Sequence, residues 1–226
     1  MPTNERSAIR IATDTVLFTV ADSALHLLLV ERGRPPFQGA WALPGGLVEP
    51  DEPLAAAARR ELNEETSVSD VPYMTQLATF GEPGRDPRGR VISVVFLGLV
   101  SAPVHVVGGD DAARAQWWAF SSLPQLAFDH DVIVNCALRR LRRLVMQDLR
   151  LVFYLTPEPF TLTEVQMAYE AIVGRPADRR NFRRRLLAEN WVQEVGIRTF
   201  KRAGRPAREY RRLPDAFVPS PEDRCV

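Results

Sequence analysis

Residues 46–68 read GLVEPDEPLAAAARRELNEETSV. The alanine-rich run at residues 53–66 predicts a helix, because proline and acidic residues stand at its start, as they usually do at helix N-termini. On a helix that turns about 100° per residue, Glu61, Glu64 and Glu65 lie within an arc of roughly 100°. Three carboxylates so close repel one another unless a cation lies among them, and such oxygen ligands suit Mg²⁺ or Mn²⁺. A glutamate cluster alone also fits a charged helix that faces solvent.

The spacing of the surrounding residues is longer and more specific than the cluster itself. Five residues separate Gly46 from Glu52, seven more lead to Arg60, and Arg60 begins the run RELNEETSV. This order resembles the Nudix box, Gly-x5-Glu-x7-Arg-Glu-U-x-Glu-Glu-x-Gly-U with U a bulky apolar residue, at every position but one. The resemblance implies a loop–helix–loop that binds Mg²⁺ and cleaves a nucleoside diphosphate linked to another group.

The resemblance also assigns roles to individual residues. It implies that Glu61 and Glu65 are the main ligands of Mg²⁺ or Mn²⁺. Glu64 is an additional ligand, and the Gly46 carbonyl coordinates beside them. Together with Arg60, the three glutamates form the candidate catalytic set. A bound cation would offset phosphate charge and help to generate hydroxide from water.

Two further positions concern the ends of the predicted helix. Arg60 can reach back to Glu52 at the helix start and orient the helix. At the helix end, Ser67 stands where the Nudix box has glycine. A glycine there ends the helix in the left-handed conformation, in which serine costs on the order of 1 kcal/mol. Ser67 removes no ligand, so catalysis stays chemically possible.

Several longer stretches are similar to a narrower family, the Nudix-related transcriptional regulators of NAD metabolism. Three of them lie in the first part of the chain: GRPPFQGAWALPGGLVEPDE, FGEPGRDPRGRVISVVF and LPQLAFDHDVIV. The other two, FTLTEVQMAYEAIVGRPADRRNFRRRLL and GRPAREYR, lie near its end. The resemblance covers about residues 8–213. It implies a domain that senses ADP-ribose or a related NAD metabolite, and a homodimer in which each protomer reads half of a palindromic operator. Some members of the family retain hydrolase activity.

The order of elements predicts two domains. Strands are expected at residues 10–20, 24–31, 72–80, 90–100 and from Trp117, followed by a helix at 129–149. The proline-containing segment 155–162 is expected to be a linker or a domain start. Helices at 161–173 and 179–189 and strands at 191–195 and 209–213 then follow the order of a winged helix-turn-helix. The expected fold is α+β: a Nudix α/β/α sandwich with a mixed sheet at 8–150, a winged helix-turn-helix domain at 151–215 and a disordered tail at 216–226.

Charge separates the two halves of the chain. The net charge is only +1, but between Arg175 and Arg212 13 basic residues stand against 4 acidic ones. Such asymmetry indicates a polyanionic partner. Phe182, Leu186 and Leu187 form an apolar stripe in the second of these helices, as expected of a recognition helix that packs on its partner. The candidate DNA-binding residues surround that stripe or flank the wing glycine: Arg179, Arg180, Asn181, Arg183, Arg184, Lys201, Arg202 and Arg205. A basic helix that contacts the acidic first domain is the alternative.

Candidate ligand-binding residues stand in the loops of the first domain. Arg32, Arg85 and Arg88 are fixed cations suited to phosphate oxygens, although each could be a solvated loop residue. Trp41 could stack on adenine or pack in the core. The pair Gly45–Gly46 follows it in the LPGG turn. His130 more often suits packing at a helix start than contact with a ligand.

Composition argues against several classes of protein. Two distant cysteines argue against a disulfide framework or a zinc site, and no apolar run predicts a signal peptide or a membrane span. A cytoplasmic location is therefore expected. Two functions remain open: a ligand-responsive repressor that binds operator DNA, and an active pyrophosphatase for ADP-ribose or a related nucleoside diphosphate derivative. In the second case the basic domain is an appendage for dimerisation or RNA binding.

Overall fold

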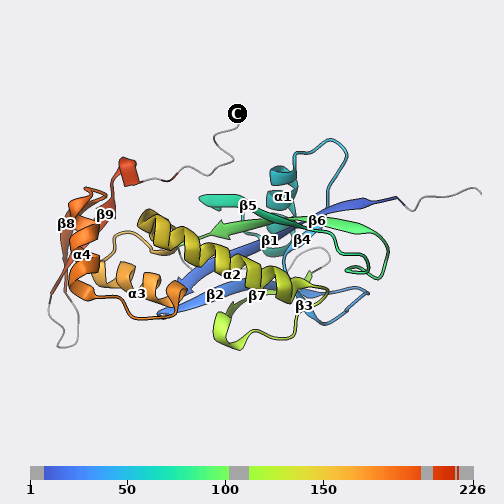
Figure 1. Cartoon of the computed structure of the whole chain (residues 1–226), viewed down its shortest axis with the longest axis horizontal. Helices are drawn as coiled ribbons and strands as arrows, with labels where there is room; N and C mark the ends of the chain where they lie inside the picture. The colour runs from blue at the N-terminus through green and yellow to red at the C-terminus, as the bar shows by residue number, and fades with distance from the viewer. Residues whose placement is uncertain (1–7, 102–111, 200–205, 217, 219–226) are drawn as a thin grey trace, which may run out of the picture.

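The computed structural model describes residues 8–101, 112–199, 206–216 and 218 (Figure 1). Its first element is a hairpin of two strands, β1 (Arg10–Ala21) and β2 (Ala24–Arg32), in which Ala21 pairs with Ala24. Asp22 and Ser23 form the turn, both with positive φ, as a tight two-residue hairpin turn requires. The predicted hairpin is confirmed.

A mixed sheet grows around this hairpin. β1 pairs in parallel with β6 (Val91–Leu99), and β5 (Tyr73–Phe80) pairs antiparallel with β6, which gives the strand order β3-β2-β1-β6-β5. Three further strands complete it: β3 (Trp41–Ala42) and β7 (Ala112–Ala119) on β2, and β4 (Gly45–Leu47) on β1.

The start of β7 differs from the prediction. A strand was expected from Trp117, but β7 already begins at Ala112 and ends just after the two tryptophans. Its first half contains alanine, arginine and glutamine, which lack the β-branched signal of a strand. Pairing with β2, supported by the Arg114–Glu31 ion pair at 3.1 Å, decides its conformation instead.

Two helices cover the two faces of the sheet. α1 (Leu54–Thr66) buries Ala58 and Leu62 against Leu17, Met74 and Phe96 of the sheet. α2 (His130–Gln147) crosses the opposite face, in front of the sheet in Figure 1. Side chains alternate between faces along each strand, so β1 sends Leu17 toward α1 and Phe18 toward α2. This is the predicted α/β/α sandwich.

The second part of the chain has the order of a winged helix-turn-helix. Its helices are α3 (Leu162–Val173) and α4 (Arg179–Ala188), and its hairpin is formed by β8 (Val192–Arg198) and β9 (Ala207–Arg212). α3 begins with a capping box in which Thr161 and Glu164 bind each other's backbone N–H. Three short 3₁₀ helices complete the fold: η1 (Phe120–Ser122), η2 (Leu149–Leu155) and η3 (Pro214–Ala216).

The segment 155–162, expected to be a linker or a domain start, is mostly buried, with Pro157 and Glu158 exposed. η2, which precedes this segment and ends at Leu155, buries every residue except Arg150. Phe160 exchanges backbone hydrogen bonds of 3.0 and 2.7 Å with Tyr210. One apolar cluster contains Phe18 of the sheet, Ile133 of α2 and Phe182 of α4. The two parts of the chain therefore share a continuous core.

The beginning of the expected tail is also in contact with the core. Ala216 is buried, and the Val218 carbonyl accepts a hydrogen bond from the Tyr154 hydroxyl at 2.7 Å. Residues 217 and 219–226 lie outside the described residues. Within the described part of the chain, every helix is too short or too polar to cross a membrane.

Candidate functional site

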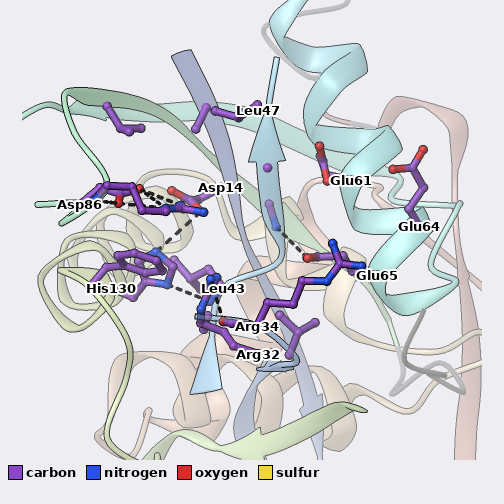
Figure 2. Close-up of a pocket in the computed structure, with 18 of the residues that line it drawn as sticks. Asp14, Arg32, Arg34, Leu43, Leu47, Glu61, Glu64, Glu65, Asp86 and His130 are labelled. Atoms are coloured by element: carbon purple, nitrogen blue, oxygen red, sulfur yellow. Dashed lines mark hydrogen bonds and ion pairs between the residues drawn. The ribbon is translucent and has the colours of Figure 1, made fainter. Parts of the chain in front are cut away.

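A cavity of about 1060 Å³ opens beside β4 and the inner side of α1 (Figure 2). Its wall combines acidic side chains from β1 and α1 with arginines from the loops after β2 and β5. The backbone of the LPGG turn forms another part of the wall, because β4 pairs with the first half of β1. This volume lies at the upper end of the range of small-molecule and cofactor sites, about 300–1,000 Å³.

Arg60 holds α1 to the loop that precedes it. Its guanidinium donates to both carboxylate oxygens of Glu52, at 2.6 and 3.0 Å, and to the Leu47 carbonyl at 3.2 Å. The hydrogen bond from Arg60 lowers the pKa of the Glu52 carboxyl to about 2. The predicted reach from Arg60 back to Glu52 is confirmed.

The three glutamates of α1 have different surroundings. Glu65 accepts a hydrogen bond from the Gly45 N–H at 2.9 Å, and burial raises the pKa of its carboxyl to about 8. The Glu61 side chain is 15% exposed, and its carboxylate leaves no room for a Cβ at Gly46. Glu64 points away from the other two in Figure 2 and is paired with Arg60 at 3.1 Å.

The donor set fits a hard cation. Glu61, Glu64, Glu65 and the Gly46 backbone all line the cavity, and carboxylate and carbonyl oxygens are the ligands that Mg²⁺ and Mn²⁺ prefer. Among the residues that the structure describes, no three His, Cys, Asp or Glu side chains already surround a point where a metal could bind. The metal-binding role of these residues therefore stays a prediction.

Ser67 has the backbone conformation expected of the glycine it replaces. Its φ of 60° and ψ of 17° are left-handed, and its N–H donates to the Asn63 carbonyl at 2.7 Å to close the last turn of α1. The helix end thus keeps the geometry of a glycine cap, with the strain of an L side chain.

A buried polar network lies at the base of the cavity. Asp14 of β1 is hydrogen-bonded to Ser93 and lies 3.7 Å from both His130 and Arg85. His130 accepts a hydrogen bond from the Leu43 N–H at 2.9 Å through Nδ1, and burial lowers the pKa of its ring. His130 thus lies on the cavity wall as a neutral, packed imidazole.

Sequence reasoning missed Asp14. The sequence feature that could have identified Asp14 is that it is the one carboxylate in the run IATDTVLFTV, in which every other residue is apolar or threonine. A buried acid in a strand needs a partner, and that partner is brought from distant parts of the chain.

The three predicted arginines all lie on the cavity wall. Arg85 forms a two-pronged ion pair with Asp129, at 2.7 and 3.0 Å, and Arg88 pairs in the same way with Asp86. The Arg32 guanidinium lies 4.8 Å above the ring of Phe128. Contact of these arginines with a phosphate stays a prediction.

Trp41 lies in the core, which agrees with the second of its two predicted alternatives and not with stacking on adenine. Its side chain is 8% exposed and packs edge-on against Trp118, with ring centroids 5.2 Å apart. The Arg114 guanidinium lies over the Trp41 ring at 5.1 Å. The aromatic ring on the cavity wall is Phe128, which sequence reasoning did not single out.

The predicted recognition helix α4 exposes its basic side. Arg179, Arg180, Asn181 and Arg184 are exposed, and Asp178 caps the helix start by accepting from the Asn181 N–H at 2.7 Å. Arg184 donates to the Asn181 side-chain oxygen at 2.9 Å. Contact of these side chains with DNA stays a prediction.

Two details of α4 differ from the prediction. Phe182 and Leu186 are buried, but Leu187 is 47% exposed, because a residue five positions after Phe182 has turned about 140° from it. Arg183 is directed toward α3, where it donates to the Thr163 hydroxyl at 2.8 Å. Lys201, Arg202 and Arg205 of the predicted wing lie outside the described residues.

Comparison with known proteins adds two family matches. The NUDIX domain model matches residues 10–140, and the NrtR DNA-binding winged helix domain model matches residues 152–212. The ADPR responsive transcriptional repressor NtrR of Acinetobacter baylyi is 36% identical over 203 residues, which cover 88% of this chain and 80% of that protein. The ADP-ribose pyrophosphatase of Methanocaldococcus jannaschii is 42% identical over 114 residues, which cover 50% of this chain and 66% of that protein.

Two solved structures of NrtR from Shewanella oneidensis are similar. Its complex with a 27mer DNA has a TM-score of 0.75 at 35% identity, over 91% of this chain and 94% of that chain. Its NUDIX domain in complex with ADP ribose has a TM-score of 0.55 at 37% identity, over 59% of this chain and 89% of that chain. These matches define the class as a NUDIX domain followed by a winged helix DNA-binding domain. The chain belongs to the NrtR family of NUDIX proteins.

Proposed function

We propose that the protein is an ADP-ribose-responsive transcriptional repressor of NAD-metabolism genes, which binds operator DNA as a homodimer through its winged helices. The observation that carries the proposal is that one continuous core joins a phosphate-suited cavity to a helix with an exposed basic side. Relatives that cover most of the chain are a repressor responsive to ADPR and a protein solved with DNA.

The cavity suits the chemistry of ADP-ribose. Arg32, Arg85 and Arg88 supply planar cations for the diphosphate, and the Phe128 ring offers a face for an aromatic or sugar group. Gly45 and Gly46 lack a Cβ, which lets β1 and the Glu61 carboxylate pack closely against the backbone of the LPGG turn beside the cavity. A Mg²⁺ or Mn²⁺ ion held by Glu61, Glu64, Glu65 and the Gly46 carbonyl would offset the remaining phosphate charge.

The proposal is tested with a gel shift on duplex DNA from the region upstream of the protein's own gene. The purified chain should bind this duplex in low salt and release it when ADP-ribose is added. AMP and ribose 5-phosphate serve as control ligands, and a duplex of shuffled sequence serves as control DNA. Failure to bind any duplex in dilute buffer would remove the regulator function.

A second candidate function is Mg²⁺-dependent hydrolysis of ADP-ribose to AMP and ribose 5-phosphate by addition of water. Glu61 and Glu65 on the cavity wall favour it, as does the similarity of the first domain to a pyrophosphatase. The bound cation would activate the water, and Arg60 would hold α1 in place. The wild-type chain and Glu65→Gln are incubated with Mg²⁺ and ADP-ribose. Turnover in the wild type alone supports hydrolysis, whereas none in either protein means that α1 only binds.

A further inference from the structure

α2 connects the cavity to the winged helix through contacts near both of its ends. Asp129, directly before α2, is paired with Arg85 of the cavity wall, at 2.7 and 3.0 Å. His130, the first residue of α2, is itself on the wall and bonded to Leu43 of the LPGG turn. The start of α2 is thus tied to two parts of the wall that a ligand would contact.

Asp129, the N-cap residue of α2, is paired with Arg85 and does not cap the helix. Its side chain forms no capping hydrogen bond, and both of its carboxylate oxygens accept from Arg85. The first N–H groups of a helix lack partners within the helix, and an aspartate at this position usually supplies one. A diphosphate that competes for Arg85 therefore acts directly on the residue that begins α2.

Arg142, in the second half of α2, makes the contact with the winged helix domain. Its Nε donates to the Ile172 carbonyl, in the last turn of α3, at 2.9 Å. The last carbonyls of a helix lack partners within the helix, and a cation there is favourable. Gly174 ends α3 with φ +77°, and a Cβ on it would lie 3.2 Å from the Arg142 guanidinium. The Arg142 side chain thus lies against the end of α3 and the glycine that follows it.

The turn after α3 passes a displacement on to α4. Glu170 accepts from the Ala177 N–H at 2.8 Å and from the Gln166 amide at 2.9 Å, so the turn is tied back to α3. Asp178 then caps α4, whose first turn presents Arg179, Arg180 and Asn181. The Ile172 carbonyl is thus connected to the basic side of α4 through α3, the Glu170–Ala177 hydrogen bond and the Asp178 cap.

We propose that Arg142 is a positioning residue that couples the cavity to DNA affinity by holding the end of α3 to α2. The proposal rests on the proposed function and names how that function is regulated. A ligand that displaces the start of α2 carries Arg142 with it, since both belong to one helix about 18 Å apart along its axis. Arg142 then shifts α3 and, through the turn that is bonded to α3, the arginines of α4, which weakens DNA binding. Linkage requires that DNA weaken ADP-ribose binding by the same factor by which ADP-ribose weakens DNA binding.

The test compares ADP-ribose affinity with and without duplex DNA in the full chain, for the wild type, Arg142→Met and Arg143→Met. Methionine keeps the length of the aliphatic stem but cannot donate to Ile172. Arg143 is an exposed residue of the same helix and serves as the matched control. The ratio of the two affinities should be on the order of tenfold in the wild type and Arg143→Met. It should fall to within about twofold of unity in Arg142→Met, while ADP-ribose affinity without DNA is unchanged.

The outcomes separate this inference from the proposed function. A wild type that binds neither DNA nor ADP-ribose removes both. If DNA changes ADP-ribose affinity in the wild type and changes it equally in Arg142→Met, only the role of Arg142 is overturned. Hydrogen exchange of the wild-type chain decides the case in which the variant has lost its fold. ADP-ribose should change the exchange of backbone amides at residues 172–181, and an unchanged pattern there, with DNA affinity still lowered, overturns the coupling through α3.

Discussion

Ser67 is an L residue in a left-handed helix cap, where glycine would be free of strain. Ser67→Gly removes a Cβ from a backbone that disfavours it and leaves the N–H bond to Asn63 intact. The relief is about 1–2 kcal/mol, and the greater freedom of glycine in the unfolded chain offsets about half of it. We expect the free energy of unfolding to rise by about 0.5–1 kcal/mol, measured by urea titration.

Ser67→Ala is the control for this change. Alanine keeps the Cβ and therefore the strain, and the serine side chain is exposed. The alanine variant should differ from the wild type by only a few tenths of a kcal/mol. A glycine variant that is less stable than the wild type would show that the αL conformation of Ser67 is not strained.

His130 gives the protein a pH-dependent stability. Burial lowers the pKa of the folded His130 ring below the unfolded value of about 6.5. As the pH falls below about 6.5, the unfolded chain binds a proton at this ring that the folded chain does not bind, so the contribution of His130 to stability decreases until the lower folded pKa is reached. The loss is at most about 1.4 kcal/mol per pH unit.

The variant His130→Asn isolates this effect. Asparagine can keep an acceptor for the Leu43 N–H but cannot be protonated in this range. The raised pKa of Glu65 adds stability over the same pH range in both proteins, so the difference between them is what reports on His130. In urea titrations at pH 7 and pH 5.5, the change in stability on acidification should be less favourable in the wild type than in the variant. Parallel changes in the two proteins would mean that His130 does not titrate differently on folding.

Single residues were predictable where spacing along one helix fixes them. The Arg60–Glu52 contact follows from a helix that begins just after Glu52, and the αL conformation of Ser67 follows from its place in the Nudix box. Asp14 could not be placed, because its partners Ser93 and Arg85 come from distant parts of the chain. Composition could not decide between cavity and core for Trp41, since an indole suits both.

At the scale of elements, α4 has an exposed basic side and packs on α3 through Phe182, whose ring lies 5.3 Å from that of Tyr169. Arg180 is exposed in its first turn, unlike Arg183, which is bonded to Thr163. We expect Arg180→Ala to weaken operator binding by roughly tenfold, the effect of losing one charged hydrogen bond to phosphate. The slope of log affinity against log salt concentration should become shallower by about 1. Fluorescence anisotropy over a salt series measures both.

A matched control separates local contact from overall charge. Arg139→Ala removes the same charge from an exposed position on α2, in the NUDIX domain. This variant should leave the salt slope unchanged. Equal slopes for Arg180→Ala and the wild type would place α4 away from the DNA backbone and favour the alternative in which its charge serves another contact.

Most elements were predictable because local patterns and tertiary packing agree. The alanine-rich α1 and the β1–β2 hairpin carry strong local signals, and both lie within a residue or two of their predicted bounds. The predicted strand at Trp117 was shorter than β7, because the first half of β7 has no strand pattern and becomes a strand only by pairing with β2. The packing of η2 was missed for the same reason: a short apolar run does not reveal what covers it.

At the scale of the whole molecule, the junction between the domains decides how the chain unfolds. Tyr154 of η2 packs against Tyr73 of β5 with ring centroids 5.3 Å apart, while Phe153 stacks on Phe160 of the second domain at 5.4 Å. η2 is therefore shared by both domains. Two domains with a common core should unfold together, whereas domains joined by a free linker unfold separately. Calorimetry should show one transition, with equal calorimetric and van't Hoff enthalpies.

The shared segment also predicts how the isolated first domain behaves. A fragment ending at residue 150 lacks Leu151, Val152, Phe153, Tyr154 and Leu155, all of which are buried in the full chain. Burial of one such side chain stabilises a fold by about 1.5–3 kcal/mol, and a domain has only about 5–15 kcal/mol in total. Part of η2 packs on the sheet, so we expect fragment 1–150 to be several kcal/mol less stable than fragment 1–157. Urea titration of the two fragments measures the difference. Equal stabilities would assign η2 to the winged helix alone and would remove the rigid junction through which a ligand in the cavity is proposed to act on α4.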